Sequence, residues 1–156
     1  MRQDLTNKVE THRYVIYDFE SDVHTLIHKP NHVEADVLQV DKNNNTYEDC
    51  LANTFRHNGY DAVEKFCDWL FTKENENSTV VAHNRAGYDG RFILQWCLNK
   101  GLHPSTYIRQ GSRIMYMTFK NQLAVCRFSA FLLGAIGKTK FDIQHRYQKR
   151  FLPASF

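Results

Sequence analysis

The chain has 156 residues, 42% of them hydrophobic and 13% aromatic, which is enough for one folded domain with a buried core. No stretch approaches the roughly 18 to 20 apolar residues of a membrane span and the N-terminus lacks a signal-peptide core, so we expect a soluble, intracellular protein with no membrane partner. The net charge of +3 is uneven, because residues 1–99 carry 10 Lys and Arg against 16 Asp and Glu whereas residues 100–156 carry 10 Lys and Arg against one acid.

The first predicted elements are strands. Residues 13–19 are rich in β-branched and aromatic side chains, which favour a strand. Residues 23–27 are expected to return as its hairpin partner, and residues 32–40 alternate well enough to predict a further strand. Residues 41–45 are a turn or loop by composition.

Helices and strands then alternate. Apolar side chains at helical spacing predict a helix over residues 61–71, with Asp61 placed to cap its N-terminus. The continuous apolar run 79–82 is typical of a short strand buried on both faces. A second amphipathic helix includes residues 92–97, and Gly101 is expected to end it in the left-handed conformation.

The basic C-terminal third is predicted to begin with two strands, over residues 113–119 and 122–128. Its basic side chains interleave with aromatic ones, a mixture that suits contact with a nucleic-acid backbone and stacking on bases. The interleaved residues are Tyr107, Arg109, Arg113, Tyr116, Phe119, Lys120, Arg127 and Phe128. A solvated basic tail is the alternative interpretation, and charge alone does not separate the two.

The cysteines point to no metal or disulfide framework. Cys50, Cys67, Cys97 and Cys126 stand singly, and no pair has the Cys-x-x-Cys spacing. We therefore expect reduced, partly buried thiols.

Two carboxylates follow the first predicted strand. Asp18 and Glu20 are two residues apart, so a strand would send both side chains to one face. An Asp-x-Glu pair also occurs by chance in a chain this acidic. The position of Asp18 and Glu20 after the apolar residues 14–17 favours a functional interpretation of this pair.

A third acid opens the second helix. Residues 84–89 combine an amide, a flexible glycine, an aromatic ring and Asp89 between a strand and a helix. The alternative is a polar loop in which Asp89 only caps the helix. If the three acids meet, their mutual repulsion requires a hard cation such as Mg²⁺ or Mn²⁺, and paired cations of this kind support phosphodiester chemistry.

Together the two segments resemble the first two exonuclease motifs of the DEDD 3′–5′ exonuclease superfamily, in the form found in protein-primed family B DNA polymerases. The likeness covers roughly residues 13–156. Within this range the chain is similar to the polymerases of linear plasmids and self-synthesising mobile elements. Besides the acids, it is carried by residues 28–31, 66–70, 79–84, 87–94, 111–115 and 149–153.

The resemblance implies a two-metal site. Asp18 would bridge two divalent ions, Mg²⁺ or Mn²⁺, and Glu20 would bind one of them and help to orient the attacking water. Asp89 would complete the set of ligands. Two ions about 3.5 to 4 Å apart generate the nucleophile and stabilise the leaving 3′-oxygen.

The resemblance also implies contacts to DNA. Phe19 and Tyr88 would pack the terminal nucleotide, although either ring also suits a protein core. Asn84 would hydrogen-bond the DNA, orient a ligand or cap its own loop. Ser129 remains where relatives have Asp-Ser-Leu, and Lys149 matches a downstream Lys-x-x-apolar contact.

The chain departs from the family most in length. The third exonuclease motif, Tyr-x-x-x-Asp, supplies the fourth carboxylate of the family and has no counterpart here, because Asp142 has no Tyr four residues earlier. The expected fold is therefore an α/β, RNase H-like mixed sheet with flanking helices, C-terminally truncated. It would comprise an N-terminal extension over residues 1–12 and a partial exonuclease domain over residues 13–156.

Three functional hypotheses follow. The chain is a fragment of a DNA-directed DNA polymerase that covers the proofreading region, a self-contained nuclease, or an inert nucleic-acid-binding remnant. The first hypothesis implies three partners: the single-stranded 3′ end of DNA, the missing polymerase domain of the parent chain and a terminal protein primer.

Overall fold

The computed structural model of the chain describes residues 10–22, 29–41, 47–49, 54–82, 88–120 and 123–127. These residues form a mixed α/β structure with one eight-stranded sheet and two α-helices. The strands are β1 (Thr11–Ser21), β2 (Pro30–Asp41), β3 (Tyr47–Asp49), β4 (Phe55–Asn58), β5 (Thr79–Ala82), β6 (Thr106–Gln110), β7 (Arg113–Thr118) and β8 (Ala124–Arg127). The helices are α1 (Ala62–Leu70), the short 3₁₀ helix η2 (Lys73–Asn75) and α2 (Asp89–Asn99).

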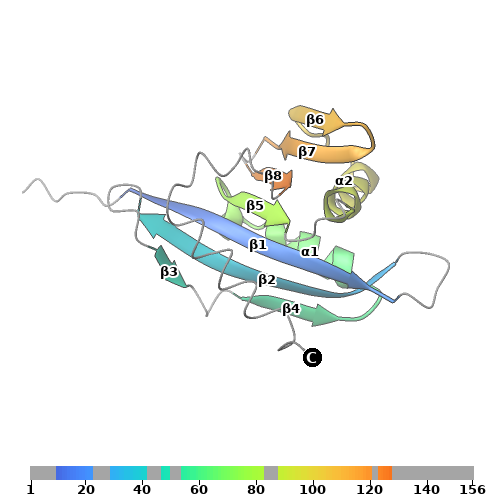
Figure 1. Cartoon of the computed structure of the whole chain (residues 1–156), viewed down its shortest axis with the longest axis horizontal. Coiled ribbons are helices and arrows are strands. Elements are labelled where there is room, and N and C mark those ends of the chain that lie inside the picture. Colours follow the sequence, from blue (N-terminus) through green and yellow to red (C-terminus); the bar gives the residue numbers. More distant parts are fainter. Residues whose placement is uncertain are drawn as a thin grey trace, which may run out of the picture.

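The sheet is mixed in direction. Its strand order is β3-β2-β1-β5-β8-β7-β6, and β4 pairs with β2 beside this path. The pairs β1–β5 and β5–β8 are parallel, and the remaining pairs are antiparallel. Figure 1 shows β3 and β4 at one end of the sheet and the β6–β7 hairpin at the other end, next to α2.

The two longest strands form the antiparallel pair β1–β2. The strand predicted over residues 13–19 is confirmed within β1, and the one predicted over residues 32–40 is confirmed within β2. The partner expected over residues 23–27 lies outside the described residues, and β2 pairs with β1 along nearly its whole length.

The core lies between the sheet and the two helices. Val15, Tyr17 and Phe19 point from alternate positions of β1 into it, and α1 places Phe66 against them. The Phe66 ring stacks on Tyr17 with centroids 5.1 Å apart and meets Phe19 edge-on at 5.4 Å. Because full burial of such a side chain contributes about 1.5 to 3 kcal/mol, this aromatic contact is a main attachment of α1 to the sheet.

The first predicted helix is confirmed as α1, but the predicted cap is wrong. Asp61 stands at the N-cap of α1 without a side-chain hydrogen bond to the helix. Its carboxylate instead accepts a hydrogen bond from Nε2 of His57, at 2.7 Å. That bond lowers the pKa of Asp61 below its ordinary value.

The second helix ends as its sequence predicts. The backbone of Gly101 has φ +74, a left-handed conformation that residues with a Cβ adopt at a cost. The N–H of Leu102 donates to the carbonyl oxygen of Cys97 at 2.8 Å and closes the last turn. Cys97 and Cys67 are free and buried, as expected for reduced thiols.

The apolar run 79–82 is confirmed as β5, between β1 and β8, and the two later strands are confirmed as β7 and β8. The sequence did not predict β3, β4 or β6. All five residues of β6 are exposed, so this edge strand has no alternation of buried and exposed side chains to recognise. In the part of the chain that the structure describes, no helix is long and apolar enough to cross a membrane.

Candidate carboxylate site at the end of strand β1

The candidate site begins where Asp18 and Glu20 share one face of β1. Their neighbours Tyr17 and Phe19 point into the core, so the two acids lie on the face of the sheet away from the helices. Asp18 is half-buried and Glu20 is exposed. The two-residue spacing therefore places two carboxylates side by side on one surface.

A third carboxylate stands beside them on β2. The register of the β1–β2 pair sets Asp18 opposite Glu34 and Glu20 opposite His32. Side chains directly opposite in an antiparallel pair lie on one face with Cβ atoms about 4.5 to 5.5 Å apart. Sequence reasoning missed Glu34 and His32, because their placement depends on a register that only the β1–β2 pairing fixes.

Two side chains contact Glu34, the cationic Arg56 and the imidazole of His32. His32 Nε2 lies 3.3 Å from Glu34 Oε1, and Arg56 Nε lies 3.6 Å from the same oxygen. His32 also hydrogen-bonds Asn58 through Nδ1. Arg56 and Asn58 come from β4, which pairs with β2 in register. The short strand β4 thus supplies the side chains that contact His32 and Glu34 from the side away from β1.

The local field disfavours a charged Asp18. Burial, followed by the charges of Glu20 and Glu34, raises the pKa of Asp18 to about 6, while His32 acts in the opposite direction. A carboxyl group in such a position loses its proton more readily when a cation lies beside it. The site therefore has the electrostatic character of one that gains from binding a positive ion.

Asp89 is the first residue of α2. Its side chain is buried, with 2% of its surface exposed. A carboxylate in the first turn interacts favourably with the positive end of the helix dipole. The next residue, Gly90, faces Ile114 of β7 closely enough that an added Cβ would lie 3.6 Å from the Ile114 Cβ.

Tyr88 and Arg91, close to the buried Asp89 in the sequence, are exposed. Tyr88 is 55% exposed, and the Arg91 guanidinium lies over its ring at 5.9 Å from the centroid. Arg91 also donates from Nη2 and Nε to the carbonyl oxygen of Ser112, at 2.6 and 3.2 Å. Arg91 therefore ties the turn between β6 and β7 to the first turn of α2.

Of the remaining predicted residues, the structure describes Phe19 alone. Phe19 is a core residue, the alternative that its sequence left open, because it is 5% exposed and packs edge-on against Phe66 and Phe92. Asn84, Ser129 and Lys149 lie outside the described residues.

The parallel strands β5 and β8 end in register beside the candidate site, and β1 continues past them to Ser21. The register pairs Tyr17 of β1 with Ala82 of β5, and Ala82 with Arg127 of β8. Asp18 and Glu20 follow Tyr17 directly, and Asp89 opens the helix that comes after β5. Within the described ranges, however, no group of three or more His, Cys, Asp or Glu side chains is arranged to hold a metal ion. The structure thus brings Asp18 and Glu20 together without joining Asp89 to them.

Comparisons with known proteins add no identification. No protein-family model, no curated protein and no solved structure matches the chain.

Proposed function

We propose that the chain is the proofreading region of a protein-primed family B DNA polymerase, with an RNase H-like 3′–5′ exonuclease fold. The observation that supports this proposal is the position of Asp18 and Glu20 on β1, just past the carboxyl ends of the neighbouring parallel strands β5 and β8. In open α/β sheets, ligands bind outside the carboxyl ends of the strands. A mixed sheet with helices packed on it is also the architecture that the resemblance implies.

The donor atoms fit a hard divalent cation. Asp18, Glu20 and Asp89 offer only carboxylate oxygens, the ligands that Mg²⁺ and Mn²⁺ prefer. The raised pKa of Asp18 reflects repulsion from Glu20 and Glu34 that a cation would relieve. We assign Asp18 and Glu20 as ligands of such ions, and the resemblance adds Asp89, which α2 would have to bring to them for two ions to be held. When bound, the ions would activate water and stabilise the leaving 3′-oxygen of DNA.

The protein's own residues would hold the DNA strand. The exposed ring of Tyr88, backed by Arg91, offers a stacking surface next to Asp89. Asn84, Ser129 and Lys149 are assigned to the same strand by the resemblance. Phe19 would position the two acids indirectly, because its packing on Phe66 fixes the backbone between Asp18 and Glu20.

A self-contained nuclease is a second candidate. Its catalytic set would require a fourth carboxylate, and Glu34 supplies one opposite Asp18. The contacts of Glu34 with Arg56 and His32 reduce its availability to a metal ion. For this reason we favour the first proposal, in which the fourth carboxylate comes from the parent polymerase.

The two candidates are separated by a nuclease assay. The purified chain is incubated with Mg²⁺ or Mn²⁺ and 5′-labelled single-stranded DNA, alongside Asp18→Ala and Asp89→Ala. Asp68→Ala is the control, because Asp68 is an exposed acid on α1. Trimming by the chain alone that both site variants abolish would support the self-contained nuclease.

The polymerase proposal expects a different pattern. The chain alone leaves the DNA intact, and 3′ trimming appears when the third exonuclease segment of the family is appended. The same two variants should remove that activity. Salt-sensitive DNA binding without trimming in either form would contradict both candidates and identify an inert binding remnant.

A further inference from the structure

A pocket lies by the amino end of β8, at the opposite end of the parallel strands from Asp18 and Glu20. It has a volume of about 400 Å³, within the range of about 300 to 1,000 Å³ of small-molecule sites. It is lined by Phe71, Gly101, Leu102, His103, Phe119 and Lys120. Phe119 donates its N–H to Leu123, which precedes β8, so the pocket sits by the amino end of this strand.

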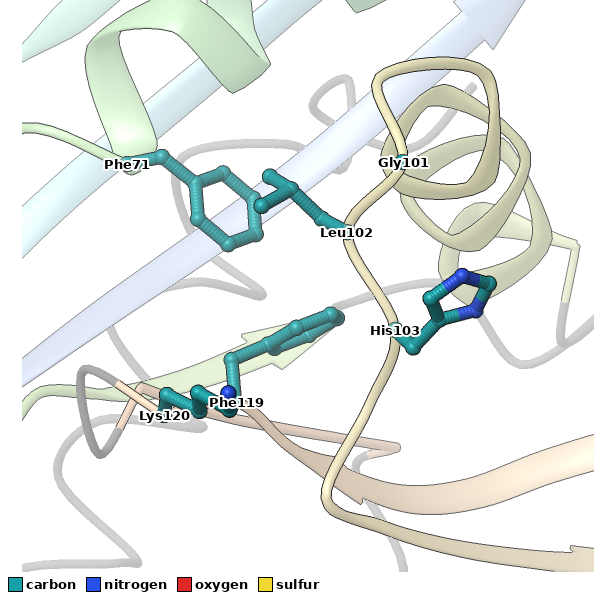
Figure 2. Close-up of a pocket in the computed structure, with 6 residues that line it drawn as sticks. All are labelled: Phe71, Gly101, Leu102, His103, Phe119 and Lys120. Carbon is teal, nitrogen blue, oxygen red and sulfur yellow. The ribbon is translucent and has the colours of Figure 1, made fainter.

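The apolar walls of the pocket are held in place from behind. Phe71 and Phe119 meet edge-on with centroids 5.2 Å apart, and Trp96 of α2 stacks on Phe71 at 5.4 Å. Leu102 is fixed by the closing hydrogen bond of α2 to Cys97 and is 40% exposed. Figure 2 shows Phe71, Leu102 and Phe119 turned towards one space. The walls are therefore preformed for a flat apolar group.

The rim of the pocket carries a histidine and a lysine. Figure 2 shows His103 on one side of the space and Lys120 on the other, and both residues are exposed. None of the lining residues is acidic, and Asp142 is the only acid after residue 99. Two nitrogen donors beside an apolar wall favour a ligand that joins a flat apolar part to an anionic part.

We propose that this pocket binds a nucleobase that carries a phosphate. The base packs against Phe71, Leu102 and Phe119, and the phosphate takes hydrogen bonds from Lys120 and His103. Aromatic side chains stack on every base, and a lysine binds phosphate as a point charge. The ligand is a free nucleoside monophosphate or one nucleotide of a single strand. This inference is independent of the proposed nuclease site, because the pocket shares no residue with it.

The test is calorimetric titration of the full chain in the presence of a metal chelator. The probes are deoxyadenosine 5′-monophosphate, deoxyadenosine, inorganic phosphate and a short single-stranded oligonucleotide. The monophosphate is expected to bind about tenfold more tightly than deoxyadenosine or phosphate, since it uses both parts of the pocket. An oligonucleotide that binds still more tightly would identify the ligand as part of a strand, and a weaker one would identify it as the free nucleotide.

Two variants locate the binding. Leu102→Glu introduces a negative charge at a partly exposed wall, and Lys120→Gln removes the rim cation; each should weaken binding of the monophosphate at least about fivefold. Lys73→Gln on η2 is the matched control, because Lys73 is exposed and does not line the pocket. Asp18→Asn should leave this binding unchanged even if it abolishes metal binding.

The proposal is overturned if the wild-type chain binds no monophosphate at concentrations on the order of millimolar. It is equally overturned if Leu102→Glu and Lys120→Gln, shown to be folded by circular dichroism, bind like Lys73→Gln.

Discussion

At the scale of single residues, Asp18 is the position where stability and function conflict. Burial and two neighbouring carboxylates raise its pKa to about 6, so its charged form costs the folded state free energy at neutral pH. A residue chosen only for stability would be uncharged here. The cost is understandable if the folded chain recovers it by binding a cation.

Asp18→Asn is therefore expected to stabilise the metal-free chain at pH 7.5. A folded-state pKa above the ordinary value means that stability is full at low pH and falls as the pH rises through about 6. Partial exposure of the group reduces the gain, which we place at about 1 to 2 kcal/mol. Urea unfolding at pH 7.5 and at about pH 3, below the ordinary Asp pKa of 3.8, measures it, and the difference from wild type should largely vanish at the lower pH. An Asn variant less stable than wild type at pH 7.5 would contradict the assigned environment.

The two described cysteine thiols should resist alkylation. Burial raises the pKa of the Cys97 thiol to about 12 and raises that of Cys67 further. Because the thiolate is the reactive species, iodoacetamide at pH 8 should label both positions at least about tenfold more slowly in the native chain than in urea. Peptide mass spectrometry separates these two cysteines from Cys50 and Cys126. Equal labelling in both conditions would show that the core around α1 and α2 opens readily.

At the scale of elements, α2 links the candidate site to the rest of the molecule. Its first turn carries Asp89 and Arg91, and its last turn closes on Gly101 beside the aromatic pocket. Changes at its two ends should therefore have separable effects.

Gly101→Ala is expected to destabilise the chain by about 1 kcal/mol, because a Cβ is strained at φ +74. Gly90→Ala is the matched control within α2. Its new Cβ would make only ordinary contact with Ile114, and alanine favours the helix by about 0.5 kcal/mol. Thermal unfolding of both variants measures the contrast. Equal effects would argue against a left-handed end of α2.

Arg91→Ala is expected to release the β6–β7 turn from α2. The variant loses the two hydrogen bonds to the Ser112 carbonyl oxygen, and a loss of about 1 kcal/mol corresponds to roughly fivefold faster amide exchange in residues 106–118. Gln95→Ala is the control, because the Gln95 side chain donates to Asn99 within the same helix. Hydrogen exchange with mass spectrometry follows both variants. Unchanged exchange in Arg91→Ala would show that the turn is held by other contacts.

Elements with a local signal were predictable, and elements made by pairing were not. The β-branched and aromatic side chains of residues 13–19 predict β1, and the spacing of apolar residues predicts α1 and α2. By contrast, β4 and β6 are short or wholly exposed and exist through their pairing with β2 and β7. The same limit applies to the site: the Asp-x-Glu pair is visible in the sequence, whereas Glu34 reaches Asp18 only through the β1–β2 register.

At the scale of the whole molecule, the sheet separates two places with opposite charge. Carboxylates gather near the carboxyl end of β1, and Lys120 borders the aromatic pocket at the amino end of β8. This separation follows the sequence, in which every acid except Asp142 precedes residue 100 and basic side chains dominate after it. The basic region would attract a polyanion to the sheet. The carboxylates would need a cation to neutralise their charge.

The central claim is that Asp18, Glu20 and Asp89 together bind divalent metal ions. Its most direct test is a titration of the chain with Mn²⁺, followed by electron paramagnetic resonance of the free ion. Wild type should bind Mn²⁺, and Asp18→Asn and Asp89→Asn should each weaken the binding by at least about tenfold, whereas Asp68→Asn should not. Binding that survives Asp89→Asn unchanged would contradict the shared site.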